Sequence, residues 1–146
     1  MILALIVYAV AMTIANLLVV KFGPAVTPIN AFVLIGLDLT LRDWLHVRLR
    51  PWQMGVLILG SGLLTWLLNP AAQNIAIASA VSFAIAAAVD WFVFGKSSGS
   101  WAARSMKSNI AGAAVDSLTF PTLAFGSLMP LIALSQFVAK VVGGAL

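Results

Sequence analysis

The chain has 146 residues, of which 62% are hydrophobic and only 8% are charged, and its mean hydropathy is +1.09. A soluble domain of this size carries about a quarter charged residues, so the composition predicts an all-α integral membrane protein. The absence of cysteine excludes disulfides, thiol catalysis and cysteine metal sites, and a lone histidine, His46, argues against a histidine metal site. The net charge of +4 comes from basic residues near the expected helix ends, which is typical of membrane topology and not of nucleic-acid binding.

Six apolar segments separated by turn-forming residues predict six transmembrane helices in a single domain, residues 1–146. The first segment lacks a basic n-region and an obvious small-residue cleavage site, so we interpret it as a retained helix and not a signal peptide. Asn69-Pro70 favours a turn after the third helix, and Pro121 is expected to end the fifth. The expected helices are residues 1–20, 29–47, 52–68, 71–94, 101–120 and 126–145.

The second expected helix carries two of the four carboxylates of the chain, within the stretch Ile35–Asp43 (I-G-L-D-L-T-L-R-D). Asp38 and Arg42 lie four residues apart, so on a helix they share a face and can form an ion pair. An ionisable residue within a membrane segment usually faces the interior of the bundle or a water-filled cavity. Two roles stay open here, an ion pair that fixes helix packing and a substrate contact in which Arg42 orients Asp38.

The basic residues favour one side of the expected bundle. With a cytoplasmic N-terminus, the turns after the second and fourth helices are also cytoplasmic, and the opposite side keeps only Lys21. This asymmetry predicts a multi-pass membrane protein with both termini in the cytoplasm. The expected cytoplasmic turns and their flanks hold Arg48, Arg50, Lys96, Arg104 and Lys107.

The first three and the last three expected helices share a plan, because in each half a polar middle helix is flanked by more apolar ones. Three spans per half would make the halves inverted relative to each other, a layout common in transporters. The two halves show no residue-level similarity to one another.

In the fifth expected helix, Asn109, Gly112 and Asp116 fall at i, i+3 and i+7 and so form a single stripe. Asn109 offers a donor and an acceptor, ionised Asp116 only accepts, and Gly112 leaves room for a flat ligand or another backbone. Hydrogen bonding between helices is the competing explanation, but an aspartate deep in a span favours substrate contact. We therefore expect Asp116→Asn protein to fold and insert normally and to lose substrate binding.

Asp90 and Lys140 both lie toward the expected cytoplasmic side and could form an ion pair between the fourth and sixth helices. The alternative is that Lys140 extends its charge to the interface alone. The sequence contains no nucleophile elbow, no set of serine, histidine and carboxylate, and no phosphate-binding glycine loop followed by lysine. It predicts neither an enzyme nor a bound cofactor or metal.

Two motifs resemble a known family. The first motif is D-L-T-x-R at Asp38–Arg42, with Asn16 upstream in A-N-L-L-V. The second is S-N-I-A-G-A-A-V-D-S-L-T-F at Ser108–Phe120. Both are similar to signatures of the queuosine-precursor transporters, also called the vitamin uptake transporter (VUT) family. V-D-W-F-V-F around Asp90 and F-V-A-K-V-V around Lys140 fit the fourth and sixth helices of that family. The resemblance covers the whole chain.

The resemblance implies import of a deazaguanine base, the cyano or aminomethyl precursor of queuosine, at a site formed by polar residues of the second and fifth helices. A carboxylate suits such a ligand, because a guanine-like edge presents two adjacent donors beside one acceptor. The implied partners are a nucleobase-like substrate and the lipid bilayer, with a homodimer left open. The substrate-binding residues expected on this basis are Asn16, Asp38, Arg42, Asn109 and Asp116.

Two other classes remain open. The chain could be the substrate-binding subunit of an energy-coupling vitamin importer, which would need an ATPase partner. A small phage-type pore protein, such as a holin, would match the length and charge but would not need Asp38 and Asp116 at mid-membrane. Uptake into ATP-free vesicles tests the first alternative, and pore activity in liposomes tests the second.

Overall fold

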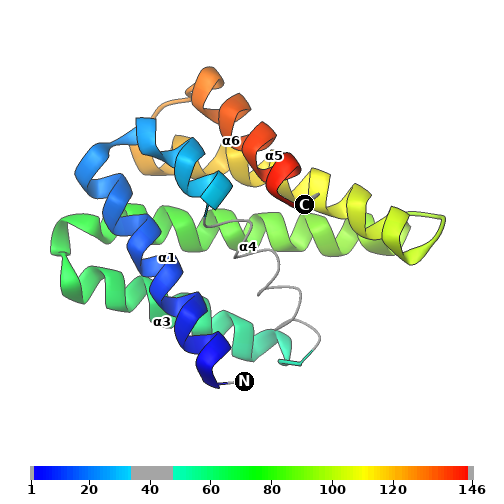
Figure 1. Cartoon of the computed structure of the whole chain (residues 1–146), viewed down its shortest axis with the longest axis horizontal. Coiled ribbons are helices and arrows are strands. Elements are labelled where there is room, and N and C mark those ends of the chain that lie inside the picture. The colour runs from blue at the N-terminus through cyan, green and yellow to red at the C-terminus, as the bar shows by residue number, and fades with distance from the viewer. Residues whose placement is uncertain (1, 34–47, 145–146) are drawn as a thin grey trace.

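The computed structural model describes residues 2–33 and 48–144, and within these ranges the chain is helical with no strand (Figure 1). The stretch from Asp38 to Arg42 lies outside the described residues. The elements are α1 (Ile2–Phe22), the 3-10 turn η1 (Pro24–Val26) followed by helical residues 27–33, α3 (Pro51–Leu68), the 3-10 turn η2 (Pro70–Ala72), α4 (Gln73–Lys96), α5 (Trp101–Phe125) and α6 (Pro130–Gly144).

The helix boundaries follow from local chemistry. The side chain of Asn69 accepts a hydrogen bond from the backbone of Ala71 at 3.0 Å, which caps η2 between α3 and α4. Ser100 caps α5 in the same way by accepting from the backbone of Ala103 at 3.3 Å. Gly126 ends α5 in the left-handed conformation, with φ 70°, which glycine adopts without strain.

Helix α5 differs from the sequence-based prediction, because it does not stop at Pro121. Proline has no backbone N–H, so it cannot bond to the carbonyl of Ser117 one turn earlier. The helix nevertheless continues to Phe125, and Pro121 is buried. Packing around Pro121 therefore outweighs the lost hydrogen bond, a situation that membrane helices tolerate.

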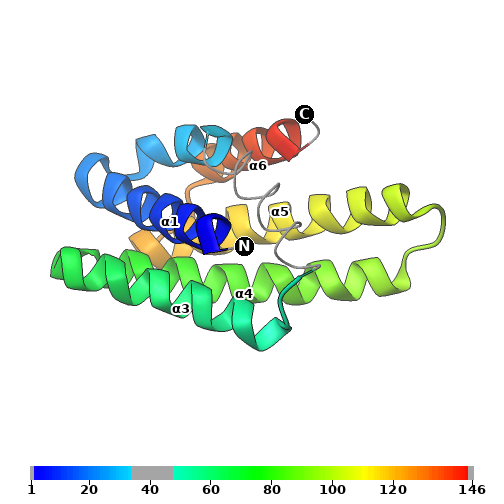
Figure 2. The ribbon, with the colours of Figure 1, turned by 60° about the horizontal axis from the view of Figure 1, so that its bottom comes forward.

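Helices α4 and α5 form a long antiparallel pair whose connection projects beyond the rest of the molecule (Figures 1 and 2). Helix α1 crosses α3 and α4, while α6 packs on α5. The helical residues 27–33 lie beside α6 in both views. The α3–α4 and α4–α5 connections are at opposite ends of the molecule.

Small side chains bring α4 and α5 close together. Ser82 and Ala86 on α4 are buried, as are Ser108 and Gly112 on α5. A Cβ atom added to Gly112 would lie 3.4 Å from the backbone oxygen of Ala86 and 3.5 Å from Cβ of Asp90. Small residues allow such close backbone approach between membrane helices. The space beside Gly112 is therefore filled by the backbone of α4.

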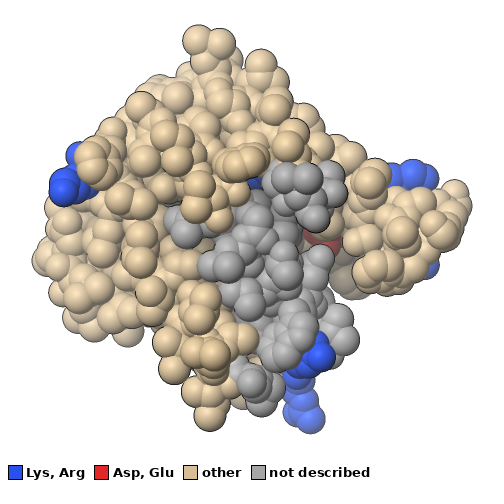
Figure 3. All heavy atoms as spheres, viewed as in Figure 1, with Lys and Arg blue, Asp and Glu red and all other residues tan. Residues whose placement is uncertain are grey.

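The outer surface of the described region is apolar. Leu59, Leu63 and Leu67 of α3 are among its exposed large hydrophobic side chains. By length and composition, α1 and the segment Pro70–Lys96 can each cross a membrane, with mean hydropathies of 2.5 and 1.9, and two shorter apolar helices are present at Gly55–Leu68 and Pro130–Val142. In Figure 3 most of the Lys and Arg atoms lie toward the edges of the face, and most of the described surface is neither basic nor acidic.

Candidate functional site

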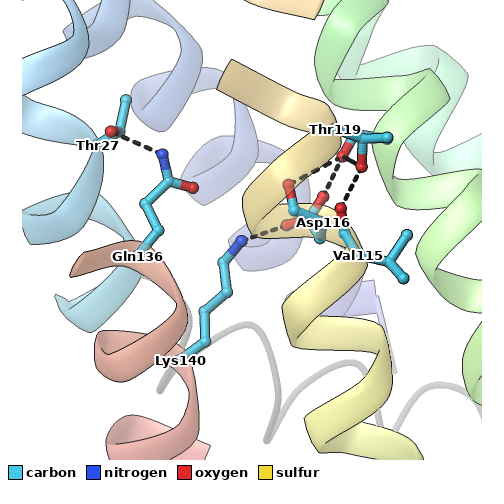
Figure 4. Close-up of polar contacts among 7 residues, drawn as sticks. Thr27, Val115, Asp116, Thr119, Gln136 and Lys140 are labelled. Atoms are coloured by element: carbon cyan, nitrogen blue, oxygen red, sulfur yellow. Dashed lines mark hydrogen bonds and ion pairs between the residues drawn. The ribbon is translucent and has the colours of Figure 1, made fainter. Parts of the chain in front are cut away.

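The most buried charged contact that the structure describes joins α5 to α6. The ammonium of Lys140 forms an ion pair with Oδ2 of Asp116 (Figure 4). The Lys140 side chain is 6% exposed and the Asp116 side chain is 28% exposed. The cation is therefore withdrawn from the surroundings, whereas part of the carboxylate remains accessible.

A serine from α4 completes the surroundings of this carboxylate. Ser82 is 0% exposed, and its hydroxyl donates to Oδ1 of Asp116 at 2.5 Å. The Oγ atom of Ser82 also lies 3.1 Å from Oγ1 of Thr119, and Thr119 donates to the backbone oxygen of Val115. A serine hydroxyl has a single proton, so the ionised carboxylate is the acceptor it satisfies. We call Ser82, Asp116, Thr119 and Lys140 the Asp116 cluster.

Helix α6 also contacts the first half of the chain. Gln136 is 2% exposed and donates from Nε2 to Oγ1 of Thr27 at 2.8 Å, while Thr27 donates to the backbone oxygen of Pro24 at 2.7 Å. Gln136 and Lys140 are four residues apart and share a helix face. That face lies between residues 27–33 and α5, so α6 carries both the Gln136 contact and the Lys140 contact seen in Figure 4.

The partner of Lys140 is not the one the sequence predicted. The expected pair with Asp90 is replaced by the pair with Asp116, and Oδ1 of Asp90 is buried with no hydrogen-bond partner among the described residues. The hydrogen bond from Ser82 shows which part of α4 lies beside the Asp116 carboxylate. Asp90 is eight residues further along α4, or about 12 Å at 1.5 Å per residue, so it lies well beyond the pair.

The stripe on α5 is divided between two roles. Asp116 belongs to the ion pair, while Gly112 is occupied by α4. Asn109 is partly buried, and the structure records no side-chain hydrogen bond for it within the described residues. Asn109 is seven residues before Asp116, about two helical turns.

Asn16 lies in a different contact, between α1 and α3. It is 4% exposed, and its Nδ2 donates to Oγ1 of Thr65 at 3.4 Å. Thr65 donates to the backbone oxygen of Ser61 at 2.8 Å, and Ser61 donates to that of Leu57 at 2.8 Å. Both are buried. We call Asn16, Ser61 and Thr65 the α1–α3 seam, a neutral hydrogen-bonded contact.

Sequence reasoning missed Ser82, Thr119 and Gln136 as members of the polar interior. A signal for Ser82 was present, because it lies eight residues before Asp90 and so on nearly the same face of α4. No local signal distinguishes Gln136. Among the described residues, no group of three or more histidine, cysteine, aspartate or glutamate side chains could hold a metal ion.

The Asp116 cluster brings a carboxylate and an ammonium together between helices. It presents a fixed acceptor, the carboxylate, next to a flexible donor, the lysine ammonium. A model of the family described as "Putative vitamin uptake transporter" matches residues 1–146. The chain belongs to this family. The membrane class that the composition predicts agrees with this membership. No curated protein and no solved structure gives a significant match.

Proposed function

We propose that this transporter imports a nucleobase-like molecule, a deazaguanine precursor of queuosine, through a mid-membrane site centred on Asp116. The observation that supports it is a buried ion pair within a family of uptake transporters. Charged groups inside a membrane protein are expensive and mark substrate or ion pathways. The proposed site includes Asn109 on the same stripe and, through the resemblance, Asp38 and Arg42, while Asn16, which bonds to Thr65, is assigned to the α1–α3 seam.

The carboxylate of Asp116 is an acceptor that the donors of a ligand could approach. Ser82 donates to one of its oxygens and Lys140 to the other, and a carboxylate oxygen can accept more than one hydrogen bond. A guanine-like edge carries two adjacent N–H donors, and a carboxylate is the side-chain group that accepts such donors in parallel. The accessible fraction of Asp116 leaves room for this approach. Aromatic rings can stack on the flat face of the base.

The proposal places the protein in the bacterial inner membrane with six spans and both termini in the cytoplasm. It is tested by incorporating purified protein into ATP-free vesicles and measuring binding and uptake of the cyano and aminomethyl deazaguanines. Both compounds should bind, and at least one should accumulate. Adenine is the control ligand, because its edge lacks two adjacent donors beside an acceptor.

The control variant is Ser135→Ala, which removes an exposed hydroxyl bonded to its own helix at Leu131. It should bind and transport like the unchanged protein. Binding without uptake would indicate a subunit that needs an energy-coupling partner. Failure of every deazaguanine to bind would contradict the proposed substrate.

A further inference from the structure

Both ends of the ion pair between Asp116 and Lys140 constrain what can enter the site. A ligand that only donates hydrogen bonds could take the carboxylate, but it would leave the buried ammonium without a partner. A ligand that only accepts could take the ammonium, but it would offer no donor to the carboxylate that pairs with Lys140. The first outcome leaves a buried charge uncompensated in a low-dielectric interior, which is strongly unfavourable.

We infer that Lys140 is a specificity-determining residue, and that the substrate inserts between Lys140 and Asp116 with its donors on the carboxylate and its acceptor on the ammonium. This inference rests on the proposed function and extends it to a rule of recognition. The accepted ligands carry adjacent donors beside an acceptor on one uncharged edge. Neither charge loses its partner, because the ligand bridges them.

The geometry of the two side chains suits insertion. Asp116 is held by Ser82, which is fully buried on the neighbouring helix, so the carboxylate is the fixed side of the pair. Lys140 has a flexible four-carbon stem and three donors, so its ammonium can follow a ligand that enters. Gln136, one turn earlier, holds the same face of α6 to Thr27. Lys140 can therefore move while the helix stays in place.

The test compares ligands that differ at single atoms. 7-Deazaguanine has the complete edge. Its 6-thio analogue keeps both donors and replaces the carbonyl oxygen with sulfur, a weak acceptor. 7-Deazahypoxanthine keeps the carbonyl and lacks the amino donor. Affinities are measured by calorimetry for the unchanged protein, for Lys140→Met and for the control Ser135→Ala, which alters an exposed position on α6.

Loss of the carbonyl oxygen should weaken binding to the unchanged protein by about tenfold, as expected for a charge-assisted hydrogen bond. In Lys140→Met the same ligand change should have an effect of less than about threefold, because the donor is gone. Loss of the amino group should weaken binding equally in both proteins, since that group faces Asp116. Ser135→Ala should behave like the unchanged protein throughout.

The inference would be overturned if replacing the carbonyl oxygen weakened binding equally in the unchanged protein and in Lys140→Met. A purely structural lysine makes no contact with that ligand atom, so removing the lysine would not change the effect of the replacement. If Lys140→Met does not fold, Lys140→Gln serves instead. Glutamine keeps a neutral donor. Replacing the carbonyl oxygen of the ligand should therefore weaken binding to Lys140→Gln by a factor between those for Lys140→Met and for the unchanged protein.

Isocytosine and its 4-thio analogue present the same edge without the fused ring and separate the two proposals. Should these pyrimidines show the lysine-dependent effect while deazaguanines fail to bind, the substrate assignment falls and the inference stands. Should deazaguanines bind with no lysine-dependent effect, the inference falls and the substrate assignment stands. Failure of every ligand with this edge to bind would overturn both.

Discussion

The α1–α3 seam and the Asp116 cluster both bury polar side chains between helices, but by different means. In the seam, each hydroxyl donates to a carbonyl of its own helix, and one amide–hydroxyl contact of 3.4 Å joins the two helices. In the cluster, three helices meet at an ion pair. Neutral contacts are common in packed membrane helices, whereas buried charge is rare and usually functional. The difference separates a structural contact from a candidate site.

The largest expected effect comes from breaking the ion pair. Asp116→Asn should destabilise the protein by about 3 kcal/mol or more, because it leaves a buried lysine uncompensated. This revises the expectation from sequence that the variant folds normally. The double variant Asp116→Asn with Lys140→Met should recover most of the stability and none of the deazaguanine binding. Denaturation in detergent and calorimetry measure the two outcomes, and normal stability of the single variant would show that the pair contributes little.

Ser82→Ala tests the α4 side of the cluster. The change removes the donor to the Asp116 carboxylate with almost no change in size. A hydrogen bond to a charged group contributes about 2 kcal/mol, so a loss of that order is expected, together with weaker substrate binding. Ala86→Ser, one turn further along α4, is the matched control for altered polarity on the same face. Equal binding by Ser82→Ala and the unchanged protein would remove Ser82 from the site.

Thr65→Val is the corresponding change in the seam. It removes the hydroxyl that accepts from Asn16. Polar contacts between membrane helices contribute about 0.6 kcal/mol on average, so the stability loss should be small. Substrate affinity should not change if the seam is structural. A loss of binding larger than the loss of stability would mean that the seam, through Asn16, also reaches the substrate, and the contrast between the regions would fail.

The smallest effect is expected at the α4–α5 connection, where Ser98→Cys provides a single label because the chain has no other cysteine. Ser98 is exposed and contributes only its backbone oxygen to a contact with Lys107 at 3.2 Å. Stability and transport should be unchanged. The thiol should be shielded from impermeant reagents in intact cells and react after lysis. Labelling from outside the cell would contradict the predicted orientation of the protein in the membrane.

Much of the helical plan could be predicted from sequence, because it depends on local properties. The apolar segments predicted where the helices lie, and Asn69-Pro70 predicted the turn between α3 and α4. Pro121 misled the prediction for a physical reason. A proline ends a helix only when nothing else holds the following turn, and burial among neighbouring helices holds it here.

The composition and motifs by themselves determined the membrane class and the family, and they drew attention to Asp116 and Lys140, because charges are conspicuous in so apolar a chain. Only the tertiary structure decided which charges meet. Helix periodicity places residues on a face, but the register between two helices depends on how their surfaces pack. The close approach of α4 and α5 at Gly112 brings Ser82 to the Asp116 carboxylate and leaves Asp90 about two turns away. Lys140 therefore pairs with Asp116, and its choice of partner depends on packing across three helices that no single segment encodes.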